Sequence, residues 1–157
     1  MAKILVAYFS ATGTTARVAK ELAQTIGGEL FQITPAIPYT PQDLNWNDKN
    51  SRSSLETSGA APLPLIAGKI ADFEQWNPIF LGFPIWWYKA PRIIDAFLQE
   101  YDFSGKKIAV FATSGGSPLG HTIEELKKIC PNADWLPGKM LRPGASGLAE
   151  WAKNVCA

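Results

Sequence analysis

Continuous runs of apolar residues, separated by polar turns, recur along the chain and predict buried β-strands. The clearest runs are residues 3–8, 78–83 and 107–112, and none of them alternates apolar and polar side chains. Residues 29–34 do alternate, as is typical of a strand near a sheet edge, and a weaker strand is expected near 134–141. Strands that are apolar on both faces belong in parallel sheets, so this pattern indicates an α/β protein.

Helical periodicity fills the intervals between these strands. Within residues 14–26, for example, apolar side chains recur four positions apart, and two glycines then end the segment. Five helices are predicted, over residues 14–26, 65–73, 91–99, 121–129 and 146–155. The alternation of strands and helices predicts a single domain, 1–157, with a doubly wound parallel sheet and helices on both faces.

Composition and charge exclude several classes of function. The 157 residues are 46% hydrophobic and 18% charged, and the net charge of +1 excludes nucleic acid as an expected partner. No apolar run reaches the roughly 18–20 residues that span a bilayer, so no membrane association is expected. The apolar run at the N-terminus is too short for a signal peptide, which predicts a cytoplasmic protein. Cys130 and Cys156 are expected to be reduced thiols, and no metal site is expected.

A hydroxyl-rich loop follows the first strand directly and predicts a phosphate site. Backbone N–H groups at the start of the next helix can converge on an anion there. The loop lacks the lysine of nucleoside triphosphate sites and the GxGxxG motif of dinucleotide sites, so it should bind one terminal phosphate monoester. A plain helix cap is the alternative, although four hydroxyls exceed what a cap needs. The candidate residues are Ser10, Ala11, Thr12, Gly13, Thr14 and Thr15.

Two more loops follow the second and third of the clearest strands. Ligands of such sheets bind beyond the carboxyl ends of the strands, so all three loops should meet at one edge. One loop offers large aromatic side chains for a flat ring, although packing into the core or at a dimer contact is the alternative for any one of them. The other offers backbone donors with little side-chain bulk. The candidate residues are Pro84, Ile85, Trp86, Trp87 and Tyr88, and Thr113, Ser114, Gly115, Gly116 and Gly120.

These motifs resemble those of one known family. The segment Ser-x-Thr-Gly-x-Thr at 10–15, placed after a first strand, looks like the FMN phosphate loop of flavodoxins. The order of elements, a Gly-x-Pro-x-Trp-Trp segment at 82–87 and a Thr-Ser-Gly-Gly-Ser segment at 113–117 extend the resemblance over the whole chain. The resemblance implies a flavodoxin-like, five-stranded parallel sheet in the order 2-1-3-4-5. It also implies FMN as the cofactor, with its phosphate at 10–15 and its ring between the two later loops.

The function that this resemblance implies is electron transfer through a non-covalent flavin. No side chain is then needed as a catalytic acid or base. Two features of this chain depart from those of typical flavodoxins. Typical flavodoxins are strongly acidic, and they often carry a glycine in the second loop. The near-neutral charge weakens electrostatic steering to a partner. The absence of glycine from 84–88 favours weaker stabilisation of a one-electron flavin radical, because a bulky loop is less able to rearrange.

Two alternatives stay open. The first is an NAD(P)H-dependent FMN reductase of quinones or similar small acceptors. The second is a flavin-free binding or signalling module of the same fold, although receiver domains need acidic residues where Ser10 and Thr12 stand. The partner is accordingly a redox partner protein or a small-molecule electron acceptor, and the chain is a monomer or a dimer. His121, past the third loop, is expected to be a solvated first-turn residue rather than a catalytic base.

A Pro- and Asn-rich insertion at 35–64 interrupts the alternation of strands and helices. A connection of this length in a compact domain is often a lid or a binding surface, although a passive surface excursion is equally open. Because it follows the second strand, it is placed to reach over the flavin edge. Its notable side chains are Tyr39, Asp43, Trp46, Asp48 and Arg52.

Overall fold

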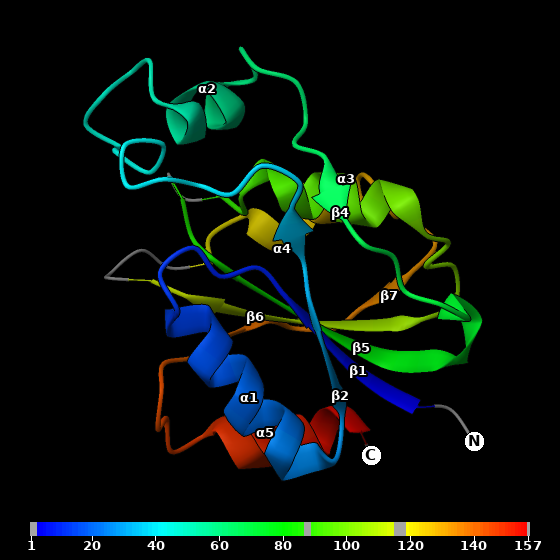
Figure 1. Ribbon diagram of the computed structural model, residues 1–157. Helices are drawn as coiled ribbons and strands as arrows, with labels where there is room; N and C mark the ends of the chain where they lie inside the picture. Colours follow the sequence, from blue (N-terminus) through cyan, green and yellow to red (C-terminus); the bar gives the residue numbers. More distant parts are fainter. Residues whose placement is uncertain (1–2, 87–88, 115–118, 157) are drawn as a thin grey trace.

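A parallel sheet forms the centre of the molecule, as Figure 1 shows, and its strands run in the order β2-β1-β5-β6-β7. The computed structural model describes residues 3–86, 89–114 and 119–156. The central strands are β1 (Lys3–Tyr8), β2 (Glu29–Gln32), β5 (Trp76–Pro84) and β6 (Lys107–Thr113). All pairs in this sheet are parallel, which confirms the predicted doubly wound arrangement.

Two short strands share the fifth position of the predicted order 2-1-3-4-5. β7 (Asp134–Trp135) pairs with the start of β6, and β8 (Lys139–Met140) pairs with its end. Pro137 lies between them and has no N–H to donate to a ladder. Gly138 lies so close to the rest of the protein that an added Cβ would stand 2.7 Å from the Ile123 side chain. One strand was predicted near 134–141, and this interruption divides it into two.

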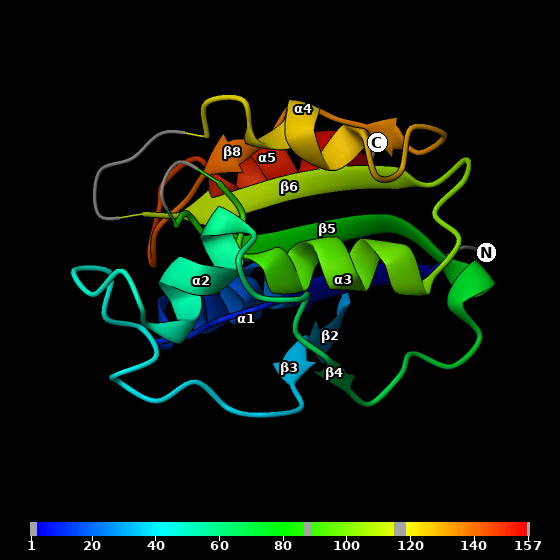
Figure 2. The ribbon, with the colours of Figure 1, turned by 90° about the horizontal axis from the view of Figure 1, so that it is seen from above.

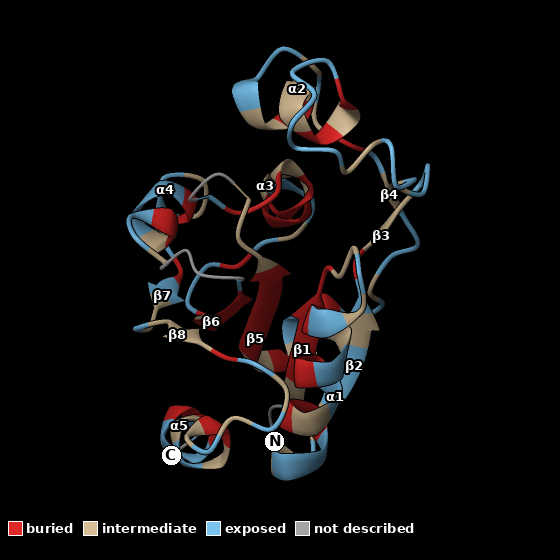
Figure 3. Cartoon of the chain, turned by 90° about the vertical axis from the view of Figure 1, so that its left-hand side faces the viewer, coloured by how far each residue is buried: buried red, intermediate tan, exposed pale blue. Residues whose placement is uncertain are grey.

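Helices cover both faces of the sheet (Figure 3). α1 (Thr14–Ile26) and α5 (Leu148–Cys156) pack on one face, and α3 (Arg92–Glu100) and α4 (Thr122–Lys127) pack on the other. Because successive strand side chains point to opposite faces, β1 contributes to two separate cores. Val6 and Tyr8 pack with the apolar side of α1, whereas Leu5 and Ala7 pack with that of α3. No helix in the described ranges is both long enough and apolar enough to span a bilayer.

The insertion and the segment after it differ from prediction. The prediction of a helix over 65–73 is wrong, because this segment contains β4 (Ile66–Ala67) and the start of a 3-10 helix, η1 (Phe73–Gln75). β4 pairs antiparallel with β3 (Thr34–Pro35) and thereby closes the base of the insertion. Gly68 explains the difference, since its φ of 79° lies outside the range of a right-handed helix.

A helix that the sequence analysis did not predict, α2 (Arg52–Ser58), lies within the insertion. The Ser51 hydroxyl caps its start by accepting a hydrogen bond from the Ser54 N–H, and Gly59 ends it in the left-handed conformation. Figure 2 shows α2 beside the start of α3, over the part of the molecule where β5 and β6 end. The insertion is therefore folded, and it lies near the carboxyl edge of the sheet.

Candidate functional site at the carboxyl edge of the sheet

The three candidate loops leave the same edge of the sheet, because β1, β5 and β6 are adjacent and parallel. The ends of these three strands lie at the left-hand side of the molecule in Figure 1. Trp87, Tyr88, Gly115 and Gly116 are outside the described residues, so their roles stay predictions. Gly120 lies apart from the strand ends, in an exposed turn before α4 with a φ of 56°, so the structure does not place it at the sheet edge. The remaining candidates lie at or directly after the ends of three neighbouring strands, as the sequence analysis expected.

The first loop leaves the N-terminus of α1 open to a ligand. Gly13 adopts a left-handed conformation with a φ of 97°, and its N–H donates to the Ser10 hydroxyl oxygen over 3.1 Å. No side chain caps α1, and no acidic residue lies in its first turn. The free N–H groups and the helix dipole therefore both favour an anion here. The Thr12 and Thr14 side chains are exposed beside this position, so the loop fits a phosphate monoester without a basic side chain.

Thr15 differs from the other hydroxyls of this loop. Its side chain is buried, and its Oγ1 lies 2.7 Å from the Oγ1 of Thr113, which is buried as well. The Thr15 hydroxyl is therefore already paired, and the exposed donors of the loop are those of Thr12 and Thr14, with Ser10 half-buried. The bond joins the start of α1 to the end of β6.

A backbone hydrogen bond joins the second loop to the end of β6. Pro84 ends β5 opposite Thr113, and the Ile85 N–H donates to the Thr113 carbonyl oxygen over 2.9 Å. Trp86 and Lys89 then exchange two backbone hydrogen bonds of 2.8 and 3.0 Å. These two bonds fix the backbone of Trp86 at the start of the second loop.

The Trp86 ring packs against two other aromatic rings. Its centroid lies 5.7 Å from the ring of Phe9 and 5.7 Å from that of Tyr39, both in edge-on geometry. Phe9 and Tyr39 are themselves 5.6 Å apart, so the three rings form a closed cluster. Packing into the core was the alternative to flavin stacking for any one aromatic residue of this loop. The structure shows that packing for half-buried Trp86, and its contact with a flavin stays a prediction.

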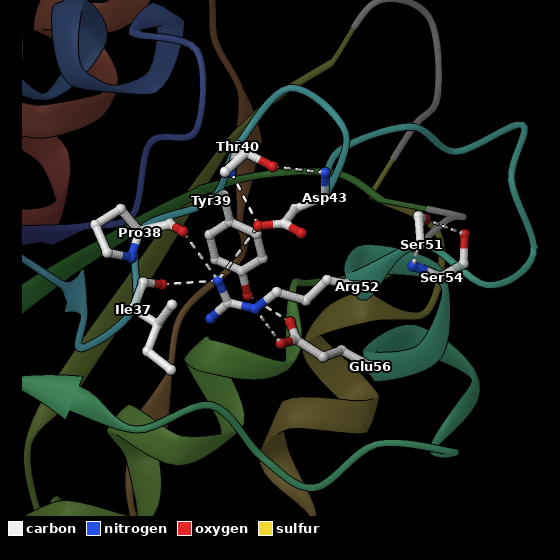
Figure 4. Close-up of polar contacts among 9 residues, drawn as sticks. All are labelled: Ile37, Pro38, Tyr39, Thr40, Asp43, Ser51, Arg52, Ser54 and Glu56. Carbon is white, nitrogen blue, oxygen red and sulfur yellow. Dashed lines mark hydrogen bonds and ion pairs between the residues drawn. The ribbon is translucent and has the colours of Figure 1, made fainter.

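Tyr39 belongs to the insertion and is fixed by a polar network (Figure 4). The Arg52 guanidinium lies over the Tyr39 ring, 3.8 Å from the ring centroid. The same guanidinium donates to the carbonyl oxygens of Ile37 and Pro38 over 2.7 and 3.2 Å, and its Nε lies 3.0 Å from the Glu56 carboxylate. The Tyr39 hydroxyl donates to that carboxylate too. Burial, and secondarily this bond to Glu56, raises the pKa of Tyr39 well above its ordinary value.

The sequence analysis named Tyr39 and Arg52 but missed their partner, Glu56. The signal available was its spacing, because Arg52 and Glu56 are four positions apart, as a helical ion pair requires. His121 also has a partner that the sequence analysis missed. Its Nδ1 lies 3.1 Å from the Glu124 carboxylate, and both side chains are largely exposed. This pair lies in the first turn of α4, which agrees with a solvated residue rather than a catalytic base.

Comparisons with known proteins decide the family. A family model described as Flavodoxin matches residues 3–155. The chain belongs to the flavodoxin family. The resemblance seen in the motifs is therefore confirmed for the fold and the family. No protein with a curated description matches this flavodoxin-family chain.

Solved structures agree with this assignment. A candidate flavoprotein from Bacteroides eggerthii DSM 20697 is 43% identical, with a TM-score of 0.92 over 100% of this chain and 99% of its own. One from Bacteroides uniformis ATCC 8492 is 45% identical, with a TM-score of 0.91 over 97% of this chain and 98% of its own. A flavoprotein from Lactobacillus acidophilus NCFM, solved in complex with FMN, is 18% identical. Its TM-score is 0.78 over 97% of this chain and 99% of its own, which shows the shared flavodoxin-type fold.

Proposed function

We propose that this flavodoxin-family protein binds FMN at the carboxyl edge of its sheet and serves in electron transfer. The observation that carries the proposal is the uncapped N-terminus of α1, which faces outward from the hydroxyl loop at 10–14. The Lactobacillus flavoprotein, solved in complex with FMN, supports the same cofactor. When bound, FMN supplies the redox chemistry, and the protein supplies binding, orientation and electrostatics.

The residues of this chain would hold the two ends of that cofactor differently. The first N–H groups of α1 and the hydroxyls of Ser10, Thr12 and Thr14 would bind the phosphate, and Gly13 lets the backbone approach it closely. Farther along the edge, Ile85 and the backbone around Ser114 would border the flavin ring and limit the access of water. The absence of a basic side chain from the loop leaves the helix dipole and hydrogen bonds as the source of affinity.

The molecule that exchanges electrons with the flavin is either a partner protein or a small electron acceptor. The net charge of +1 provides little electrostatic steering to a protein partner, and this favours a small acceptor as the second candidate function. The cytoplasmic location proposed with this role is supported by Cys130 and Cys156, which are both free thiols. Rapid bleaching of the flavin by NADPH without a partner protein is the result expected of a reductase, and no bleaching is expected of a carrier.

The visible absorption spectrum of the purified protein tests the cofactor assignment. Flavin bands are expected, and heat-released cofactor should co-migrate with FMN. Release of FAD would contradict the single-phosphate argument, and a colourless protein that does not take up added FMN would contradict the proposal. The Gly13→Ala variant links the cofactor to this site, because the substitution lies in the phosphate loop.

A further inference from the structure

The aromatic cluster of Phe9, Tyr39 and Trp86 adjoins both loops that are proposed to bind FMN. Phe9 directly precedes Ser10, the first residue of the phosphate loop, and its N–H donates to the Gly82 carbonyl oxygen over 2.9 Å. Trp86 lies in the second loop, shortly after β5 ends. The Tyr39 ring lies 5.6 Å from that of Phe9 and 5.7 Å from that of Trp86, and it is the member of the cluster that the insertion contributes. The position of the Tyr39 ring therefore affects the starts of two loops at once.

The segment that carries Tyr39 is held mainly by two side chains of α2. In the part of the chain that the structure describes, the hydrogen bonds of residues 37–39 go only to Arg52 and Glu56. Ile37 and Pro38 are exposed, so apolar packing does little to fix the backbone on the N-terminal side of Tyr39. The placement of the Tyr39 ring therefore depends on these contacts with α2.

The Arg52 guanidinium makes three kinds of contact with this segment and its surroundings (Figure 4). Its Nη1 donates to the Ile37 and Pro38 carbonyl oxygens over 2.7 and 3.2 Å, and its Nε donates to the Glu56 carboxylate over 3.0 Å. The plane of the group also lies over the Tyr39 ring, with Cζ 3.8 Å from the ring centroid. A lysine ammonium has no planar fork of donors, so arginine is specifically suited to this position.

Burial strengthens these contacts. The Arg52 side chain is 21% exposed and the Glu56 side chain 5%, so solvent screens the pair only in part. Phe9 and Trp86 meet the Tyr39 ring edge-on, whereas Arg52 covers a face of it. Loss of the guanidinium would free residues 37–39 and leave the buried Glu56 carboxylate without its cation. The Tyr39 ring would then lose the contacts that hold it against Trp86.

We propose that Arg52 is a positioning residue for the FMN site. It acts through Tyr39 on Phe9 and Trp86, and thereby fixes the starts of the phosphate loop and the second loop. This inference rests on the proposed function, because it gives the insertion a role in binding that cofactor. The insertion is accordingly part of the cofactor site, and α2 is the element that holds it in place.

Titration of the apoprotein with FMN tests this role. Arg52→Met removes the donors and the charge, and it should raise the Kd for FMN about tenfold, a loss typical of removing a residue that supports the binding groups without touching the ligand. Arg52→Lys keeps a charge beside Glu56 but not the planar fork, so its Kd should be intermediate. If Arg52→Met does not fold, Arg52→Lys decides by the same criteria.

Lys106→Met is the matched control. Lys106 also donates to two backbone carbonyl oxygens, over 3.1 and 2.8 Å, and its Nζ lies 5.1 Å from the centroid of the Phe73 ring. It directly precedes β6 and so lies at the amino edge of the sheet, opposite the proposed site. Lys106→Met should therefore lower stability and leave the Kd for FMN unchanged.

Two further measurements test the path from Arg52 to Trp86. In a Trp86→Ala background, Arg52→Met should change the Kd less than about twofold, because the path is already broken. Hydrogen exchange in the apoprotein needs no FMN. The Trp86 N–H donates to the Lys89 carbonyl oxygen over 2.8 Å, and its exchange relative to the amides of β1 should be faster in Arg52→Met and unchanged in Lys106→Met.

Each contrary outcome has a distinct meaning. Equal Kd values for Arg52→Met and the parent protein would overturn the inference. A rise of the same size in the Trp86→Ala background or in Lys106→Met would also overturn it, because the effect would then bypass Trp86 or reflect a general loss of stability. Unchanged exchange at Trp86 would equally do so. Failure of the parent protein itself to bind FMN would instead overturn the proposed function, and this inference with it.

Discussion

The Oγ1 atoms of Thr15 and Thr113 lie 2.7 Å apart, although 98 positions separate the two residues in the chain. Both side chains are buried, so neither hydroxyl has ready access to water as a substitute partner. Thr15 lies in the first turn of α1, and Thr113 is the last residue of β6. This single bond therefore couples the proposed phosphate loop to the loop that is expected to border the flavin ring.

Replacing one member of the pair should cost both stability and cofactor affinity. Thr113→Val keeps the volume but leaves the Thr15 hydroxyl without its partner, which costs about 1–3 kcal/mol of unfolding free energy. Urea denaturation measures this cost, and FMN fluorescence titration should show weaker binding. The double variant Thr15→Val/Thr113→Val should recover part of the loss, because no buried hydroxyl is then unpaired. Strictly additive losses would contradict a direct bond.

Gly13→Ala tests the phosphate loop itself. The φ of 97° lies in the region that side chains disfavour, although no atom lies within 4 Å of the added Cβ. The strain costs on the order of 1–3 kcal/mol, and relief of that strain would move the N–H groups that we expect to bind phosphate. The Kd for FMN should rise about tenfold, equivalent to about 1.4 kcal/mol. Gly105→Ala, with a φ of 75° and no atom near its Cβ, should lower stability but leave the Kd unchanged.

Gly82→Ala should destabilise the centre of the sheet. An added Cβ would stand 2.1–2.7 Å from ring atoms of Phe111, its partner on the neighbouring strand β6. The buried ring must shift, and such overpacking costs typically about 1–3 kcal/mol. Thermal denaturation should show a lower Tm. Adding Phe111→Leu should recover part of the Tm, because the smaller side chain makes room for the methyl group. No recovery would indicate that backbone strain, rather than the ring contact, is the cause.

The elements that could be predicted from sequence are those with strong local periodicity. The strand at 3–8 and the helix at 14–26 have the predicted bounds, because their apolar pattern and end signals lie within a few residues of one another. The meeting of three loops was also predictable, since parallel strands carry their carboxyl ends to one edge. These inferences needed no knowledge of contacts between distant residues, and family membership supports them.

The features that were missed depend on contacts between distant parts of the chain. The four hydroxyls of the first loop look alike in sequence, and only the position of Thr113 shows that Thr15 points inward. The insertion has weak local periodicity, and α2 is held by the Arg52 contacts with Ile37 and Pro38, 15 and 14 positions earlier. The pairing of β3 with β4 likewise joins positions more than thirty residues apart, which a local pattern cannot indicate.

Tyr39→Phe should change the pH dependence of stability. Burial and the hydrogen bond to Glu56 raise the pKa of Tyr39 in the folded protein above its value in the unfolded chain, which is about 10. The stabilisation is therefore complete below about pH 10 and declines as the pH rises further, because the unfolded chain then loses a proton that the folded protein keeps.

At neutral pH the variant loses a hydrogen bond to a charged group, worth about 1.5–3 kcal/mol. Its ring can still pack against Trp86 and under Arg52, so the fold and the cluster of aromatic rings should persist. Urea denaturation at a series of pH values measures the difference in unfolding free energy between the parent protein and Tyr39→Phe. That difference should be constant from neutral pH to about pH 9 and then shrink, because only the parent protein has the tyrosine that titrates. A difference that stays constant or grows in alkaline solution would show that Tyr39 does not keep its proton in the folded state.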